Sequence, residues 1–356
     1  MNYICTWLCA DKEGEESIFP QTGQKSSSQS HQNIYWRCLT VFYITSKRFN
    51  KNEKHQLYTN VRSLPVVDGR NMQEILAALQ VEVIFTDFKY KTPEGYFGMF
   101  QNQFYEFSIL EYIVRNNENQ DDQYMILDSD CIFLKPAAQL FREASNQGFL
   151  SFEDECTTDL VIHGLSRKNM KTVYEDLLGQ EINEIPGYHL GEFYLCSVKN
   201  TRTIFSGFLE LWPVLMERFK LGLPKFNEEA HTLSYLYYKN GFKASESKTL
   251  MKRIWTNPLF YRNVSPSDTK LVVWHMPAEK LFGLADLYDF FMNHSANYGF
   301  DNSDENYINY VQRTLGIPSL SFMMKCKYYT HSYYRAIIKR IRKMKPVLKT
   351  KPALAN

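Results

Sequence analysis

The chain has 356 residues, 44% of them hydrophobic and 22% charged, with a formal net charge of +2, which predicts a packed globular protein of one large or two smaller domains. It has no apolar run of 18 residues, which argues against a membrane-spanning helix, and its start lacks the basic region of a secretory signal. Its seven cysteines include no C-x-x-C pair and lie mostly in apolar segments, which favours reduced core residues over a disulfide or zinc framework. We therefore expect a cytoplasmic protein.

The first third of the chain alternates between strand and helix patterns. Apolar runs predict strands at 3–9, 55–60 and 81–88, and helical periodicity predicts helices at 34–50, 71–80 and 98–116. A polar segment at 11–32 follows the first strand, and we expect it to close over a ligand. This order favours a mostly parallel sheet with helices on both faces. No G-x-G-x-x-G follows the first strand, which argues against a dinucleotide site of the Rossmann type.

Two aspartates, Asp128 and Asp130, stand between apolar runs at 124–127 and 131–134. The first run predicts a buried strand that ends at Leu127, because ionised carboxylates are costly to bury inside a sheet. Both aspartates then lie at the carboxyl edge of the sheet, where ligands of open α/β sheets bind. Carboxylates at this spacing can share one hard divalent cation, which also bridges the oxygens of a diphosphate. The alternative is a polar turn between two strands.

The second half of the chain continues the alternation. Apolar runs predict strands at 148–154, 187–197 and 270–275, and periodicity predicts helices at 136–147, 165–180, 201–219, 227–241 and 278–294. Pro136 suits the first turn of its helix, Pro213 predicts a kink, and Asn227 is the expected N-cap of the helix that it begins.

A histidine, His275, follows the apolar run at 271–274 and therefore also lies at a strand end. Neutral imidazole is a good ligand for transition metals, and it favours Mn²⁺ over Mg²⁺ beside two carboxylates. We expect His275 to complete the metal site. The alternative is a surface or core histidine whose hydrogen bonds are satisfied.

The segment YMILDSDCIF, at 124–133, resembles the D-x-D segment of glycosyltransferases with the GT-A fold, and the resemblance extends loosely from the first strand to about residue 290. It implies an α/β fold with a mostly parallel sheet flanked by helices. It implies a nucleotide-sugar donor, a UDP-sugar above all, and Mn²⁺ or Mg²⁺ held by Asp128 and Asp130 against the donor diphosphate. It also implies a catalytic domain at 1–295, with a donor half at about 1–135 and an acceptor half at about 136–295, and a helical extension at 296–356.

His275 and Lys280 belong to HMPAEKLF, which is similar to the H-x-x-G-x-x-K segment of family 8 glycosyltransferases. The resemblance implies that the histidine completes the metal site and that the lysine touches the diphosphate. It also implies a transfer that retains the anomeric configuration of the donor. The chain departs from this pattern at Ala278, which stands in place of the glycine, and its lysine comes one residue early.

Five other residues are candidates for binding or catalysis. Glu228 and Glu229 begin a predicted helix, where a carboxylate serves as general base in inverting GT-A enzymes, although acidic residues also favour helix N-termini for the dipole alone. Gly191 and Glu192 resemble the glycine-containing loop that borders the acceptor in this fold, with a β-bulge glycine as the alternative. Thr6 lies on the first strand, where the GT-A fold meets the nucleobase and ribose of the donor.

The C-terminal residues 325–356 contain ten lysines and arginines and no acidic residue, so the remainder, with 31 basic and 39 acidic residues, has a net charge of −8. At helical spacing, the apolar and basic side chains separate into a face with Tyr334, Ile337, Ile338, Ile341 and Met344 and a face with Arg335, Lys339, Arg342 and Lys343. This pattern predicts an amphipathic helix bound to anionic lipid at the inner face of a membrane. The alternatives are a helix docked on the body and a nucleic-acid patch.

Together these features predict a metal-dependent glycosyltransferase of the hexosyltransferase type. It would move a sugar from a nucleotide-diphosphate sugar to a hydroxyl of a glycan or lipid-linked glycan, without a nucleic-acid partner. A haloacid-dehalogenase-like phosphatase is one alternative, but its second aspartate is normally followed by Thr or Val, where this chain has Cys131. A non-catalytic sugar- or membrane-binding module with a degenerate site is the other, and the intact aspartate pair argues against it.

Overall fold

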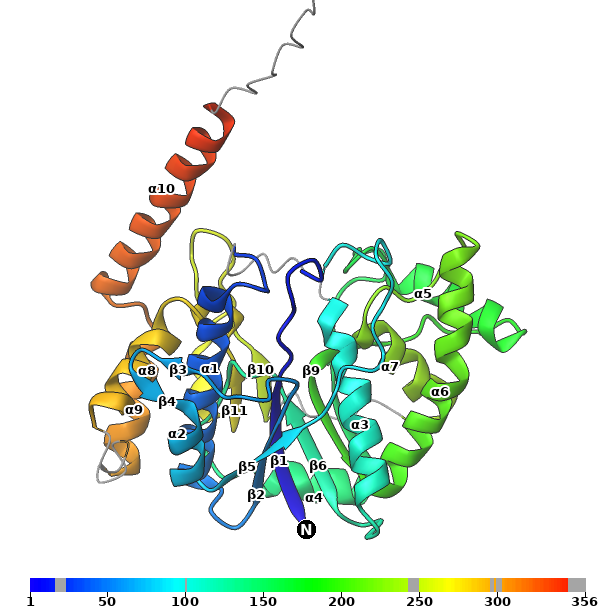
Figure 1. The fold of residues 1–356 in the computed structure, drawn as a ribbon, viewed down its shortest axis with the longest axis horizontal. Helices are drawn as coiled ribbons and strands as arrows, with labels where there is room; N and C mark the ends of the chain where they lie inside the picture. The colour runs from blue at the N-terminus through cyan, green and yellow to red at the C-terminus, as the bar shows by residue number, and fades with distance from the viewer. Residues whose placement is uncertain (17–23, 100, 243–249, 295–297, 299–302, 345–356) are drawn as a thin grey trace, which may run out of the picture.

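A computed structural model describes residues 1–16, 24–99, 101–242, 250–294, 298 and 303–344. Helices lie on both faces of a central sheet, and one C-terminal helix projects from this body (Figure 1). The predicted fold class, an α/β protein with a mostly parallel sheet flanked by helices, is confirmed.

Six strands form the central sheet in the order β5-β2-β1-β6-β9-β8. The first four run parallel to one another, while β9 is antiparallel to both β6 and β8. The strands are β1 (Asn2–Leu8), β2 (Lys54–Thr59), β5 (Val81–Phe85), β6 (Gln123–Leu127), β8 (Phe149–Asp154) and β9 (Tyr188–Ser197). Every residue of β6 is buried, and the strand ends at Leu127 as its apolar run predicts. The carboxyl ends of β1 and β6 therefore meet at one edge of the sheet.

A smaller sheet determines where His275 lies. Its strands are β7 (Cys131–Phe133), β10 (Met251–Arg253) and β11 (Val273–His275), in the order β10-β11-β7. His275 pairs with Cys131 on antiparallel β7 and with Arg253 on parallel β10. The backbone N–H of Met276 donates to the carbonyl of Asp130 at 3.0 Å. This pairing brings the end of β11 beside the two aspartates.

Helices divide between the two faces of the central sheet. Residues of α1, α2, α4, α8 and α9 share one core with Ile4, and residues of α3, α5, α6 and α7 share the other with Cys5, as the alternation of a strand requires. Their bounds are α1 (Gln29–Phe49), α2 (Met72–Ala78), α3 (Tyr105–Asn116), α4 (Ala138–Gln147), α5 (Arg167–Leu178), α6 (Val198–Lys220), α7 (Glu229–Lys239), α8 (Gly283–Asn293) and α9 (Asp304–Thr314). A two-stranded ribbon, β3 (Val66–Val67) with β4 (Arg70–Asn71), precedes α2.

Two helices differ from the sequence-based expectation. The helix expected at 34–50 begins earlier, because Ser28 caps α1 by accepting a hydrogen bond from the backbone N–H of His31 (3.3 Å). The helix expected at 98–116 is divided into a short 3-10 helix, Gln101–Phe104, and α3. Both differences bring polar side chains to the carboxyl edge of the sheet.

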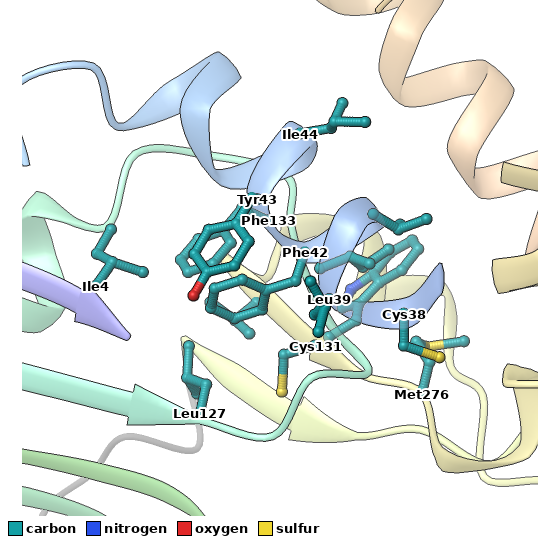
Figure 2. Packing of buried hydrophobic residues seen from close by; sticks show 14 of the residues in the cluster. Ile4, Cys38, Leu39, Phe42, Tyr43, Ile44, Leu127, Cys131, Phe133 and Met276 are labelled. Atoms are coloured by element: carbon teal, nitrogen blue, oxygen red, sulfur yellow. The ribbon is translucent and has the colours of Figure 1, made fainter. Parts of the chain in front are cut away.

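The core beneath the aspartates is formed by α1 packed against the small sheet (Figure 2). Phe42 of α1 meets Phe133 of β7 edge to face, with ring centroids 5.6 Å apart, and both side chains are fully buried. Leu127 and Cys131, which flank the aspartates in the chain, belong to the same cluster (Figure 2). Close packing on both sides of the turn fixes the backbone that carries the two carboxylates.

The predicted boundary between catalytic domain and extension, at 295 and 296, lies outside the described residues. Beyond it, α9 contributes Tyr307 and Val311 to the core, and Asp304 forms an ion pair with Arg48 of α1 at 2.9 Å. The division into donor and acceptor halves stays a prediction.

The C-terminal helix α10 (Phe322–Met344) packs on the body through its first turns. Met324 and Tyr328 are buried, and the Tyr328 hydroxyl donates to Glu279 and lies 3.1 Å from the Thr256 hydroxyl, which also donates to Glu279. Farther along, Tyr333 is 72% exposed, and the helix projects from the body (Figure 1). Within the described part of the chain, no helix combines the length and the hydropathy that crossing a bilayer requires.

Candidate active site

The two aspartates occupy the turn between β6 and β7. The N–H of Asp128 donates to the carbonyl of Glu192 on β9 (3.2 Å), and the N–H of Cys131 donates to the carbonyl of Asp128 (3.0 Å). The Asp130 side chain is 2% exposed, whereas that of Asp128 is 25% exposed. Asp128 therefore faces the open side of the turn, and Asp130 lies behind it.

His275 joins the aspartates from the end of β11. Its Nε2 lies 3.2 Å from Asp130 Oδ2 and 3.5 Å from Asp128 Oδ2, and one ligand atom from each of the three residues lies within 4.8 Å of the others. Among the described residues, this is the one group of three such side chains that could hold a metal ion. Both ring nitrogens of His275 are buried and make no well-directed hydrogen bond, which fits a ligand position. Two carboxylates and an imidazole suit a divalent cation.

Further charges surround these three residues. Lys280 forms a buried ion pair with Asp130. Glu192 lies 3.2 Å from His275 Nδ1 and accepts a hydrogen bond from Arg253 Nε at 2.6 Å. Glu192 therefore contacts the His275 ring opposite the aspartates, an arrangement typical of metal-binding histidines.

The surroundings give the two aspartates different protonation behaviour. Burial, with the charge of Asp130 adding to it, raises the pKa of Asp128 to about 6, against the opposing effect of His275. Burial also acts to raise the pKa of Asp130, but Lys280 and His275 outweigh it and hold that pKa well below its usual value. Asp130 is therefore ionised at neutral pH, and a cation held at Asp128 would compete with a proton as the pH falls below about 6.

The three residues line a cavity of about 230 Å³. Its wall combines aromatic, polar and charged side chains from the end of β1, the start of α1, the short 3-10 helix before α3, the turn after β6, the small sheet, and the loops after β8, β10 and β11. They include Trp7, Leu8, Cys9, His31, Gln32, Tyr35, Asn102, Gln103, Asp128, Asp130, His163, Arg253, Trp255, His275 and Lys280. A cavity of this composition beside a candidate metal group suits a small polar ligand with an aromatic part.

Thr6 does not line this cavity, contrary to its predicted contact with the donor. Its side chain is fully buried, and its hydroxyl donates to the carbonyl of Leu127 at 2.8 Å, which links β1 to β6. The next residues, Trp7, Leu8 and Cys9, line the cavity instead. Trp7 and Leu8 lie on opposite faces of β1 and both line the cavity, so Thr6 is excluded by its distance from the carboxyl end of the strand and not by its face.

Gly191 and Glu192 also lie outside the cavity wall, contrary to their predicted contact with the acceptor. Glu192 is directed at Arg253 and His275. A Cβ at Gly191 would collide with the carboxylate of Glu229, so glycine allows β9 to approach α7. The pairing of β8 with β9 shifts register opposite residues 191–193, which supports the β-bulge interpretation of this glycine.

Glu228 occupies the N-cap position of α7, where Asn227 was expected, and its side chain makes no capping hydrogen bond. The Asn227 side chain instead donates to the carbonyl of His163 at 3.0 Å. Glu228 is 1% exposed, bonds to Nδ1 of His163, and accepts a hydrogen bond from the Tyr188 hydroxyl at 2.6 Å. It is absent from the cavity wall, so His163 stands between this carboxylate and the cavity.

Glu229 is likewise buried behind the cavity wall. The side-chain amide of Gln103 lines the cavity and, oriented with its nitrogen toward Glu229, donates to both carboxylate oxygens at 2.9 and 3.1 Å. Burial, with the charges of Glu228 and Glu106, raises the pKa of Glu229 well above its usual value. Neither glutamate is therefore placed to reach a substrate hydroxyl in the cavity directly.

Several cavity residues escaped the sequence interpretation, notably Gln103, His163, Arg253 and Trp255. Gln103 falls inside the helix expected at 98–116, the other three lie in loops and short segments without periodicity, and no motif marks any of them. The one local signal was the dipeptide His163-Gly164, because glycine favours turns and turns present side chains to ligands.

The fold and the site define an α/β protein with a candidate divalent-metal group at the carboxyl edge of a mostly parallel sheet. No protein-family model and no curated protein matches the sequence. The structure is similar to solved glycosyltransferases at low identity. Mouse xyloside xylosyltransferase 1 shares 13% identity at a TM-score of 0.44, over 77% of this chain and 97% of that chain. The bifunctional glycosyltransferase WbbM shares 10% identity at a TM-score of 0.48, over 76% of this chain and 45% of that chain. The galactosyltransferase LgtC, solved with donor and acceptor sugar analogues, shares 11% identity at a TM-score of 0.46, over 91% of this chain and 99% of that chain.

Proposed function

We propose that the chain is a metal-dependent glycosyltransferase that moves a sugar from a nucleotide-diphosphate sugar to a hydroxyl of a glycan or lipid-linked glycan. The observation that carries the proposal is the convergence of Asp128, Asp130 and His275 in a cavity wall that also contains Lys280. A leaving diphosphate needs positive charge at close range, and this wall offers both a ligand set for a cation and a lysine. A phosphatase of the haloacid-dehalogenase type would need a further acidic pair beside the two aspartates. Among the described residues His275 joins them instead, which supports a transferase.

The residues divide the work of such a transfer. Asp128, Asp130 and His275 would hold Mn²⁺ or Mg²⁺, and the imidazole favours Mn²⁺. A cation bound there supplies Lewis-acid stabilisation of the charge that develops on the diphosphate. Lys280, held by its ion pair with Asp130, adds a second positive charge. The aromatic side chains of Trp7 and Tyr35 in the same wall support a nucleoside, and we propose a UDP-sugar as the donor.

We propose that the transfer retains the donor's anomeric configuration. An inverting transfer needs a base that removes the acceptor proton on the face opposite the leaving group, whereas a retaining transfer can use a leaving phosphate oxygen. Neither Glu228 nor Glu229 lines the cavity, so neither is placed to remove the acceptor proton directly.

Metal-dependent binding and breakdown of a donor test the proposal. UDP-, GDP- and dTDP-sugars are screened by thermal shift with Mn²⁺ or EDTA, and CMP-sugars, which carry one phosphate, are the control. We expect one diphosphate donor to raise the melting temperature only with Mn²⁺, because a ligand at 100 Kd stabilises the native state by about 2.7 kcal/mol. Release of the nucleoside diphosphate is measured on the same donor. Absence of both effects for every diphosphate donor contradicts the proposal, and an inverted product in NMR contradicts retention alone.

We further propose that α10 attaches the enzyme to the inner face of a membrane. Tyr329, Tyr333 and Tyr334 are 60–72% exposed, and Ile337 is 38% exposed on the same helix. The sequence from residue 333 onward contains eight of the ten basic residues counted above. Each lysine or arginine near an anionic surface contributes about 1 kcal/mol to binding.

Truncation after Ser332 tests this attachment while keeping Tyr328, whose hydroxyl satisfies buried Glu279. We expect nucleoside diphosphate release to be unchanged and sedimentation with phosphatidylglycerol vesicles to be lost. Binding of the full chain should weaken as salt rises, because salt screens charges at the surface. Vesicle binding that survives the truncation, or that salt does not affect, rules out the tail as the anchor.

A further inference from the structure

His163 lies at the tip of a tight turn that faces the cavity. Ile162 and Leu165 pair through two backbone hydrogen bonds, of 2.9 and 3.1 Å. The two residues between them both have positive φ, +46° at His163 and +85° at Gly164, the pattern of a type I′ turn. A positive φ is unfavourable for a residue with a Cβ, so the fold holds the His163 side chain in place at a conformational cost.

The start of α7 holds this turn from behind. The side chain of Asn227 donates to the carbonyl of His163 at 3.0 Å. A Cβ at Gly164 would come within 2.7 Å of the Asn227 amide nitrogen and 3.2 Å of the Phe97 ring, which leaves room only for glycine. The turn is therefore packed closely enough to give the His163 ring one location.

Glu228 sets the orientation and tautomer of that ring. It is 1% exposed and bonds to His163 Nδ1, while it also accepts a hydrogen bond from Tyr188 and lies 3.6 Å from His231 Nδ1. Burial acts to raise the pKa of Glu228, but these neighbours outweigh it and lower that pKa. An ionised carboxylate only accepts hydrogen bonds, so Nδ1 of His163 is the donor to it, and the neutral tautomer that makes this hydrogen bond has its lone pair on Nε2.

We propose that His163 binds the sugar acceptor, with its Nε2 accepting a hydrogen bond from an acceptor hydroxyl, and that Glu228 is the residue that positions it. The His163 side chain is 33% exposed and lines the same cavity as the candidate metal ligands. Trp255 in the same wall offers an apolar surface to a sugar ring. The inference rests on the proposed function and assigns an acceptor subsite to it. Glu228, whose carboxylate was expected to face the acceptor itself, thus acts through His163.

The subsite should recognise a hydroxyl as a hydrogen-bond donor. A fluorine in place of that hydroxyl keeps the size but cannot donate. One singly deoxyfluorinated analogue of the bound sugar is therefore expected to bind less tightly than its parent, by about ten- to a hundredfold, the loss that follows when a buried polar group is left unpaired.

The test measures glycoside binding without relying on turnover. The full chain is saturated with UDP and Mg²⁺, which does not broaden NMR signals. Methyl glycosides of galactose, glucose and mannose, with their deoxyfluoro analogues, are titrated by ligand-observed NMR. The test variant is His163→Asn, because asparagine tolerates positive φ and the turn should persist. The control variant is His294→Asn, the same change at an exposed histidine at the end of α8.

We expect His163→Asn to weaken glycoside binding by about ten- to a hundredfold and to lose the discrimination against the fluoro analogue. Its thermal shift with UDP and Mg²⁺ should stay at the wild-type value, and His294→Asn should change neither measurement. Unchanged glycoside affinity overturns the proposal, as does a glycoside loss matched by an equal loss of UDP binding. No glycoside binding by the wild-type chain also overturns it. If this subsite behaves as expected while no donor is cleaved, the subsite stands and the proposed transferase function fails.

A double-variant cycle separates positioning from simple structural support. The amide of Glu228→Gln can turn its nitrogen toward His163, which allows the other tautomer and makes Nε2 a donor. We expect this variant to lose discrimination against the fluoro analogue in the wild-type background and to change binding less than twofold on top of His163→Asn. Equal losses in both backgrounds would mean that Glu228 acts on the fold rather than through His163.

Discussion

Asp128→Asn is expected to abolish metal-dependent donor binding and to lower donor turnover by about 10³-fold or more, while the protein stays at least as stable as the wild type. Loss of an anionic ligand removes most of the stabilisation that a bound cation gives to the leaving diphosphate, which amounts to several kcal/mol. Stability should not suffer, because burial and the nearby Asp130 charge already disfavour ionised Asp128 and raise its pKa.

Asp130→Asn should cause a similar loss of donor binding but also destabilise the protein. Asp130 forms a buried ion pair with Lys280, and removal of one partner of such a pair typically costs about 3–5 kcal/mol. The two variants therefore share a functional defect and differ in stability, which a surface location or a purely structural role of the aspartate pair would not produce.

Both variants are measured by thermal shift with donor and Mn²⁺ and by release of the nucleoside diphosphate. Asp121→Asn is the matched control, since Asp121 is exposed and lies in the turn before β6. Wild-type turnover that remains sensitive to EDTA in Asp128→Asn would show that the metal is held elsewhere.

Glu192→Gln is expected to weaken Mn²⁺ binding by about 10- to 100-fold, although Glu192 is not itself a candidate ligand. Both oxygens of its carboxylate accept hydrogen bonds from Arg253, and the carboxylate also lies next to Nδ1 of His275. Oε1 accepts from Arg253 Nε and lies 3.2 Å from His275 Nδ1, while Oε2 accepts from the second nitrogen of Arg253. In Glu192→Gln an amide NH2 replaces one of these oxygens and meets the Arg253 guanidinium donor against donor, so the side chain must shift and the His275 ring loses its fixed orientation.

Direct Mn²⁺ titration followed by electron paramagnetic resonance measures this affinity without a substrate. Glu153→Gln on β8 is the control. Glu153 also forms an ion pair with an arginine, Arg167, at 3.9 Å, but it is not part of the candidate metal group. Equal Mn²⁺ affinity in Glu192→Gln and the wild type would contradict a role of Glu192 in holding His275.

The framework of the fold followed from local patterns in the sequence. The apolar run of β6 ends at Leu127, where two charged residues cannot continue a buried strand, so the sheet edge could be predicted. The run before His275 identified β11 for the same reason. The start of α1 was missed because its cap, Ser28, lies in a polar segment without periodicity.

The roles of single side chains were harder to predict than their positions. Glu192 was expected to face an acceptor, but strand pairing places it beside Asp128 and turns it toward His275. Glu228 looked like a helix cap or a base, and only the tertiary contact with His163 shows why a buried carboxylate is held there. Such contacts join segments that are distant in the chain, and local composition carries no information about them.

The small sheet also determines when the candidate metal group can first exist. Asp130 and Lys280 are 150 positions apart, and β11 reaches β7 only after the chain between them has been made. A nascent chain that has emerged only as far as β7 presents the aspartates without their histidine and lysine. The proposed cation affinity would thus be acquired in one late step of synthesis rather than gradually, and closing so long a loop makes that step slow relative to local folding. Tight Mn²⁺ binding would consequently distinguish finished molecules from released fragments.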